Sequence, residues 1–341
     1  MDAKELCFEL AAADGTSGDE AAACAVCKKY LSKFMTVKTD ITGSLVGTLG
    51  NGKFKILLDA HIDRIGLVVR EIDEQGFLLV SGVGGVDARV LVGAEVTVMG
   101  KEPLRGVICS TPPHLLTSED KEKGVEVKNL AVDIGLSKEK AEKEVSVGDR
   151  ILVSSKPLSL LDGKISCAAL DNRSGAAALV LAAQRVSGRL KNCSVALQFS
   201  AQEEVGGSGA KTAAYTADSD AAIVVDVGFG SDAYCDKTET NTLSKGPSIG
   251  ISPTLDRALG KELSELAKDK GIPFQHDVMS GRTGTNADQI NISRGGVKTA
   301  LLSIPLRYMH TQVEVIDTKD VEYTAELIAA YILKKEAELD A

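Results

Sequence analysis

The stretch "CSVALQFSAQEEVGG", residues 193–207, joins an apolar run to two adjacent glutamates. Residues 193–199 have the length and apolar density that are typical of a buried strand. Glu203 and Glu204 follow the end of this run, where two neighbouring carboxylates repel each other and lose hydration unless a positive charge compensates them. The stretch therefore predicts a strand of a buried sheet, followed by a site that requires a cation.

Strand-like and helix-like segments alternate on both sides of this stretch. A second apolar run, "FKILLDA" at residues 54–60, is typical of a strand in a parallel sheet. After about residue 160 the pattern predicts strands at 193–199, 221–227 and 297–304, and helices at 174–186, 254–271 and 319–339. Alternation of this kind indicates an α/β fold built around a largely parallel sheet.

The segment between the two α/β parts has a different sequence pattern. Short β-type runs broken by glycine, such as "GLVVREI" and "AEVTVMG", fill residues 66–160 and predict a small β-barrel or sandwich. We therefore expect a catalytic α/β domain in two parts, residues 1–65 and 161–341, with an inserted all-β domain at 66–160.

Composition excludes several classes of partner. The chain has 341 residues, with 39 basic and 48 acidic side chains and a net charge of −9, which argues against nucleic acid and anionic membrane surfaces as partners. The first twenty residues lack the order of a secretory signal, and the longest apolar stretch is too short to cross a bilayer. A small molecule or a peptide is the expected partner.

Seven scattered cysteines are typical of thiols kept reduced, which predicts a cytoplasmic protein. Cys24 and Cys27 form a C-x-x-C pair that could serve redox chemistry or a metal. Because the pair lies within a predicted helix and has no second C-x-x-C, we favour two buried thiols. Ser17 and Glu20 have the spacing of a capping box at the start of the same helix.

Residues suited to metal binding lie where the predicted strands end. They are His61, Asp63, Asp171, Glu203, Glu204, Asp226 and His310. Ligand sites in open α/β sheets form at the carboxyl ends of the strands. Imidazole and carboxylate are the ligands that Zn²⁺, Co²⁺ and Mn²⁺ accept in hydrolases, so the set predicts a site for divalent metal ions.

The sequence resembles a known family across nearly its whole length. The segments "AHIDRIG", "ALDNRSG", "AQEEVGGSGA", "VVDVGFG" and "SIPLRYMHTQVEVI" are similar to the signature blocks of the metallo-aminopeptidases that include glutamyl aminopeptidase and the dodecameric tetrahedral aminopeptidases. The resemblance implies a zinc-exopeptidase-like three-layer α/β/α catalytic domain with an inserted barrel-like dimerisation domain. It also implies removal of N-terminal residues from short peptides, and homo-oligomers in which dimers assemble into a dodecamer.

The same resemblance assigns a role to each candidate residue. Asp171 would bridge two divalent ions, zinc or cobalt in the first instance and manganese as a further choice. His61 and Asp226 would complete the ligands of one ion, and Glu204 and His310 those of the other. Asp63 would orient His61, and Glu203 would act as the general base.

Two residues depart from the family pattern. Arg64 stands where the family usually has glutamate, and its positive charge could favour acidic substrates or pair with a neighbouring side chain. Asn286, in "GTNADQI", replaces a common aspartate in a loop that the resemblance places near the substrate. His114 and His276 match no ligand block, so we expect structural roles for both.

Two other functions compete with a peptidase. Paired carboxylates also occur in glycoside hydrolases of the endoglucanase kind, although that chemistry requires neither histidine nor a bridging aspartate. The absence of tryptophan and the aromatic content of 4% leave few platforms for sugar stacking. A non-catalytic metal-binding assembly protein is the second alternative, which loss of a ligand or of the base would favour.

Overall fold

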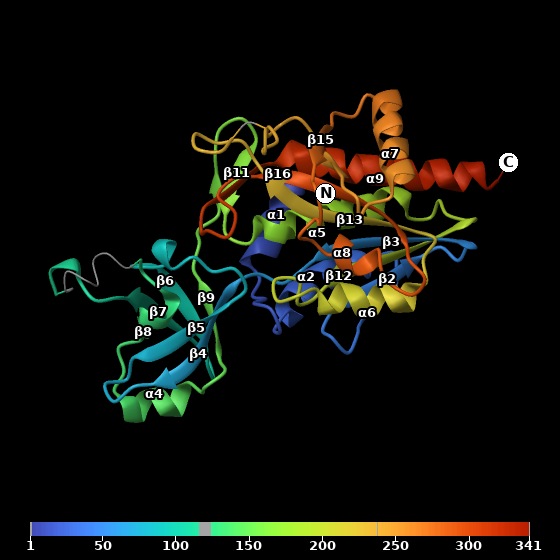
Figure 1. Cartoon of the computed structure of the whole chain (residues 1–341). Helices are drawn as coiled ribbons and strands as arrows, with labels where there is room; N and C mark the ends of the chain where they lie inside the picture. Colours follow the sequence, from blue (N-terminus) through green and yellow to red (C-terminus); the bar gives the residue numbers. More distant parts are fainter. Residues whose placement is uncertain (1, 116–123, 237, 341) are drawn as a thin grey trace.

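The chain folds around one central sheet (Figure 1). The structure is a computed structural model and describes residues 2–115, 124–236 and 238–340. Eight strands form this sheet. In spatial order they are β1 (Val37–Thr39), β2 (Leu45–Leu49), β12 (Cys193–Ser200), β3 (Phe54–His61), β13 (Ala221–Phe229), β16 (Lys298–Leu306), β14 (Ser248–Ile251) and β15 (Gln275–Val278).

The four central strands, β12, β3, β13 and β16, run parallel to one another. Strand β2 pairs antiparallel with β12, and β14 pairs antiparallel with β16 and parallel with β15. Since the central strands share a direction, their carboxyl ends lie at one edge of the sheet. The predicted strands at 54–60, 193–199, 221–227 and 297–304 are these four.

Helices cover both faces of the sheet. The alternation of a strand sends Ile56 and Leu58 into one core and Leu57 into the other. The larger core contains residues of α1 (Ala3–Ala12), α2 (Ala21–Leu31), α5 (Leu170–Val186), α7 (Arg257–Lys270) and α9 (Thr318–Glu338). Helices α6 (Ser208–Ala217) and α8 (Ala287–Ile290) contribute to the smaller one. The predicted three-layer α/β/α architecture is confirmed.

Helix α7 illustrates how local sequence sets these boundaries. Asp256 caps its start by accepting a hydrogen bond from the backbone N–H of Leu259. Gly271 ends it with φ +68°, a left-handed conformation that glycine adopts without steric cost. The helix therefore fills the segment that the sequence predicts.

The inserted segment forms a separate lobe with its own core (Figure 1). Its six strands close into a barrel. In barrel order they are β4 (Gly66–Ile72), β5 (Leu78–Val83), β8 (Ala131–Asp133), β7 (Pro103–Cys109), β6 (Glu95–Met99) and β9 (Arg150–Val153). The predicted all-β insertion thus takes the form of a closed barrel, while the division at residues 66 and 160 stays a prediction.

Short elements complete the described chain. Strands β10 (Leu158–Ser159), β11 (Lys164–Cys167) and β17 (Glu314–Asp317) form a small antiparallel sheet, and α4 (Lys138–Glu144) belongs to the barrel lobe. Three single-turn 3-10 helices are η1 (Ala88–Val90), η2 (Pro113–Leu115) and η3 (Val127–Asn129). Among the described residues, no helix combines the length and apolar character needed to cross a membrane.

Candidate metal centre

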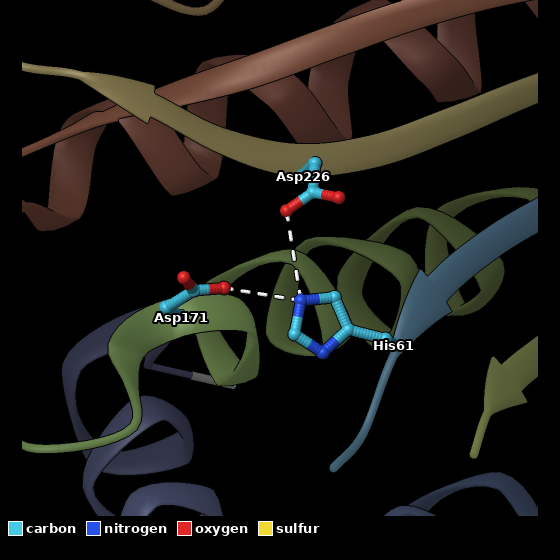
Figure 2. Close-up of side chains that lie close together, drawn as sticks. All are labelled: His61, Asp171 and Asp226. Atoms are coloured by element: carbon cyan, nitrogen blue, oxygen red, sulfur yellow. Dashed lines mark hydrogen bonds and ion pairs between the residues drawn. The ribbon is translucent and has the colours of Figure 1, made fainter. Parts of the chain in front are cut away.

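The polar residues at the strand ends converge on one place. His61 is the last residue of β3, Asp226 lies in β13, and Asp171 lies in the first turn of α5. Figure 2 shows Asp171 and Asp226 both directed at the same nitrogen of His61. The Nε2 atom of His61 is 3.0 Å from Asp171 Oδ1 and 3.6 Å from Asp226 Oδ1.

A second group shares Asp171 with the first. His310, in the loop after β16, places its Nε2 atom 3.3 Å from Asp171 Oδ2 and 3.3 Å from Glu204 Oε2. The two oxygens of Asp171 therefore face different histidines. Ligand-type atoms of each group lie within 4.8 Å of one another. The structure brings together the five residues for which the sequence predicts metal ligation.

The electrostatics of the cluster favour added positive charge. Hydrogen bonds with Asp171 and Glu204 raise the pKa of His310 to about 11. Burial acts to raise the pKa of Asp171, but hydrogen bonds with His310 and His61 outweigh it and hold this pKa well below its usual range. Burial raises the pKa of Asp226, although its hydrogen bond with His61 opposes the shift. Carboxylates held so close together require compensation by a cation.

This donor set fits divalent metal ions. Each of the two groups contains one imidazole and two carboxylates, and Asp171 belongs to both groups. These side chains offer the nitrogen and oxygen ligands that are found in zinc-type hydrolase sites. A carboxylate that presents one oxygen to each histidine has the arrangement required of a bridging ligand. The residues therefore suit a pair of ions.

Asp63 holds the turn that carries the two glutamates. Its Oδ1 atom accepts the backbone N–H of Glu203 at 3.0 Å, and its Oδ2 atom accepts that of Glu204 at 3.2 Å. Asp63 Oδ1 also lies 3.4 Å from Nδ1 of His61, whose other ring nitrogen faces the cluster. A single carboxylate thus orients both a candidate ligand and the "QEEV" turn.

Ser17 does not serve the capping box that its spacing predicts. Its hydroxyl donates to Asp63 Oδ2 at 2.5 Å, and helix α2 begins after Glu20 without a side-chain cap. Glu20 instead accepts the backbone N–H groups of Gly18 and Gln202. That prediction was wrong because a tertiary contact with a buried carboxylate competes with the local helix signal.

Glu203 lies beside the cluster, and no side-chain hydrogen bond is found for it within the described part of the chain. Burial raises the pKa of its carboxyl group to about 8, and nearby His61 opposes the shift while Asp226 adds to it. Such a group exchanges protons near neutral pH, which is the property required of a general base.

Two further residues of the site were missed by sequence reasoning. Glu314, in β17, is buried and accepts the backbone N–H of Asp171 at 3.1 Å and that of His310 at 2.9 Å. The carbonyl oxygen of Gly85 lies 3.0 Å from Nδ1 of His310, so the barrel lobe contacts a candidate ligand. An isolated glutamate in the apolar run "VEVI" was the one available signal for Glu314.

Asn286 is a buried residue, and its expected place near the substrate stays a prediction. Its side chain is 1% exposed and donates hydrogen bonds to Asp59 Oδ2 at 2.8 Å and Ser200 Oγ at 2.7 Å. Burial raises the pKa of Asp59 to about 7, and hydrogen bonds from Ser200 and Asn286 oppose this shift. Asn286 is therefore part of a buried polar contact within the fold.

The remaining candidates lie outside the cluster. Cys24 and Cys27 are free, buried thiols in α2, and burial raises the pKa of both. His276 lies in β15 against Ser264, and His114 lies in η2. The interpretation of the C-x-x-C pair as helix-buried thiols agrees with this burial.

The α/β fold and a strand-end cluster of histidines and carboxylates define the class of this protein as a metal-dependent hydrolase. Comparison with known proteins gives the family. A lysyl aminopeptidase of Pyrococcus furiosus is 32% identical over 301 residues, which cover 87% of this chain and 86% of that protein.

Solved structures agree in fold over nearly the full length. A TET aminopeptidase from the marine sediment archaeon Thaumarchaeota archaeon SCGC AB-539-E09 matches with a TM-score of 0.93 and 32% identity, covering 99% of this chain and 98% of that one. The TET1 peptidase of Pyrococcus horikoshii, described as assembling into a tetrahedron or a large octahedral shell, matches with a TM-score of 0.85 and 32% identity, covering 96% and 98%.

The chain belongs to the M42 glutamyl aminopeptidase family, which matches residues 43–327. It is accordingly a metal-dependent aminopeptidase, a hydrolase of peptide bonds. The resemblance to this family seen in the sequence is confirmed.

Proposed function

We propose that this protein removes N-terminal residues from short peptides at a site that holds two divalent metal ions. The observation that carries the proposal is the position of Asp171, whose two carboxylate oxygens face His61 and His310 separately. His61 and Asp226 would complete one set of ligands, and Glu204 and His310 the other. When bound, the ions would supply Lewis acidity that activates a water molecule and polarises the scissile carbonyl.

The protein's own groups would move the proton. Glu203 is held beside the cluster by the hydrogen bond from its backbone N–H to Asp63, and its side chain remains free to act. As a carboxylate beside the bound ions it would accept a proton from the attacking water and deliver it to the leaving amine. Asp63 is a positioning residue, because it touches His61 and the turn and lies behind the cluster.

The choice of metal follows from the donor set. Imidazole nitrogen and carboxylate oxygen suit zinc and cobalt, and manganese is a further candidate because it accepts carboxylate ligands readily. All cysteines of the chain lie among the described residues, and their seven thiols are free, which supports a reducing compartment such as the cytoplasm.

A homo-oligomer built from dimers, up to a dodecamer, is also proposed. The TET1 peptidase of Pyrococcus horikoshii, which can assemble into a tetrahedron or a large octahedral shell, supports it. In this chain, apolar side chains are exposed on the barrel lobe and the segment that follows it, including Val107 at 47% and Leu161 at 91%. An enclosed assembly would restrict access to short peptides.

The test measures two activities on one preparation. We expect release of free amino acid from aminoacyl-nitroanilides, loss of that release after chelation, and recovery on adding Zn²⁺, Co²⁺ or Mn²⁺. Release of reducing sugar from cellulose, with nitroanilide hydrolysis absent, would instead establish the glycoside hydrolase. Absence of both activities, in a protein that binds metal, would favour a non-catalytic metal-binding protein.

A further inference from the structure

A segment near the start of the chain docks just beyond the end of β3. Ser17 donates its backbone N–H to the carbonyl oxygen of Arg64 at 3.1 Å, and Arg64 donates its own to the carbonyl oxygen of Gly15 at 2.9 Å. The residues at 17–20, "SGDE", are called the SGDE segment below, and both Ser17 and Glu20 are buried. Docking therefore brings two polar side chains of this segment next to the candidate site.

The turn that carries the two glutamates is held by carboxylates from other parts of the chain. The backbone N–H of Gln202 is accepted by Glu20 Oε1 at 3.2 Å. The next two backbone N–H groups, those of Glu203 and Glu204, are accepted by Asp63. Three successive N–H groups of the turn thus have side-chain acceptors, and the SGDE segment supplies the first of them.

Gln202 is the residue at which the chain turns out of β12. Its φ is +61°, a left-handed conformation that is costly for a residue with a Cβ atom. Glu20 holds this conformation by accepting the N–H of Gln202, and the same oxygen accepts the N–H of Gly18 at 2.6 Å. Because Gln202 directly precedes Glu203, its conformation sets the direction in which the Glu203 side chain leaves the turn.

Ser17 acts on the same turn through Asp63. Its hydroxyl donates to Asp63 Oδ2 at 2.5 Å, and this oxygen also accepts the backbone N–H of Glu204. The hydroxyl therefore orients the carboxylate that holds both glutamates. The two buried polar side chains of the SGDE segment converge on one turn by two separate routes.

We propose that Ser17 and Glu20 are positioning residues for Glu203, and that the SGDE segment belongs to the catalytic apparatus. This inference rests on the proposed aminopeptidase function, in which Glu203 is the base. A base must lie within hydrogen-bond reach of the proton that it accepts, and a misplacement of about 1 Å can cost on the order of a hundredfold in rate. Loss of these contacts should therefore lower the rate while the metal ions stay bound.

The first experiment measures nitroanilide hydrolysis and metal content on the same samples of Glu20→Ala and Glu20→Gln. In Glu20→Ala, kcat should fall roughly tenfold to a hundredfold, with KM within about threefold of the wild type and metal content unchanged. Glu20→Gln should recover most of the rate, because its amide oxygen can accept the same two N–H groups. Asp19→Ala, which removes an exposed carboxylate of the same segment, is the matched control and should keep the wild-type kcat.

A double-mutant cycle distinguishes positioning of the base from a general effect on the fold. If Glu20 acts through Glu203, adding Glu20→Ala to Glu203→Gln should change the remaining rate by less than about threefold. An equal loss in both backgrounds would overturn the inference, because the contact would then act independently of the base. Loss of metal from Glu20→Ala, or a Glu20→Gln variant as slow as Glu20→Ala, would overturn it as well.

Ser17→Ala tests the second route and remains informative if thermal unfolding shows that Glu20→Ala does not fold. We expect kcat to fall roughly threefold to tenfold with metal content unchanged, since Asp63 loses one of the hydrogen bonds that orient it. Wild-type kcat in Ser17→Ala would overturn the role of the SGDE segment while leaving the aminopeptidase intact. A wild-type protein without activity on any aminoacyl substrate would overturn the proposed function, and this inference with it.

Discussion

At the scale of single residues, the proposed mechanism gives different tasks to the neighbouring Glu203 and Glu204. Glu204 reaches His310 and belongs to one metal-type group, whereas Glu203 has a free side chain with a pKa raised to about 8. Asp63 makes this possible because it accepts both backbone N–H groups and so fixes the direction of the turn. The proposal of one metal ligand and one base follows from this difference between the two carboxylates.

The buried contact of Asn286 with Asp59 gives a prediction for pH-dependent stability. Asn286→Asp places a second carboxylate against Asp59, whose folded-state pKa is already raised from 3.8 to about 7. A raised carboxyl pKa means that the folded state binds more protons, so stability falls as pH rises from the unfolded value through the folded one. The variant should be destabilised by about 2 kcal/mol or more at pH 8, and by less at pH 5.

Thermal unfolding of wild type and Asn286→Asp at both pH values, with chelator present, measures this difference. Subtracting the wild-type change removes the contribution of other titrating groups. An equal loss of stability at pH 5 and pH 8 would mean that the two carboxyl groups do not interact.

Most of the ligand-type residues could be predicted from the sequence because they lie at or just after the end of an apolar strand. His61 and Glu204 are examples, and their common position at strand ends needs no tertiary information. Ser17 and Glu314 could not be found this way, because their roles depend on contacts with residues far away in the chain. The contact of the Asn286 side chain with Asp59 likewise depends on tertiary structure that the sequence pattern does not show.

At the scale of elements, the loop after β5 links the barrel lobe to the cluster. The carbonyl of Gly85 faces Nδ1 of His310, and a Cβ atom at Gly85 would lie 2.9 Å from that nitrogen. Gly85→Ala should displace the imidazole and weaken metal binding by the group of Asp171, Glu204 and His310 roughly 10- to 100-fold. Equilibrium dialysis against each metal measures the affinity.

Gly82→Ala is the control, because Gly82 lies in strand β5, just before the loop that carries Gly85. A Cβ atom at Gly82 would make only ordinary contact with Val86, at 3.6 Å, so metal affinity should stay at the wild-type value. Wild-type affinity in Gly85→Ala as well would show that the barrel lobe does not position His310.

The longer elements could be predicted and the shortest could not. Strand β3 and helix α7 carry eight and fourteen residues, enough for their apolar pattern to be distinctive. Strands β10 and β15 have two and four residues, which is too few for a periodic pattern, and they form through pairing with neighbours.

At the scale of the whole molecule, the barrel lobe projects from the α/β body (Figure 1). Apolar side chains such as Val107 are exposed on this lobe. If dimers assemble into a dodecamer, light scattering should give a mass of about 430 kDa, twelve times the 35.8 kDa of one chain. A mass of one chain at micromolar concentration would contradict the proposed assembly, and a mass of two chains would support the dimer alone.

The proposed mechanism requires separate roles for the two adjacent glutamates. Glu203→Gln removes the base and leaves every ligand-type side chain in place, whereas Glu204→Ala removes one side chain from the second metal-type group. The matched pair therefore separates loss of rate from loss of metal, provided that metal content and turnover are measured on the same samples.

Metal content and turnover of Glu203→Gln, measured together by elemental analysis and nitroanilide hydrolysis, test the central claim most directly. We predict two ions per chain, as in the wild type, with kcat reduced roughly 10²- to 10⁴-fold. Glu204→Ala should instead lose metal along with activity. Near-normal turnover in Glu203→Gln with its metal retained would contradict the claim that Glu203 is the base of a metal-dependent aminopeptidase.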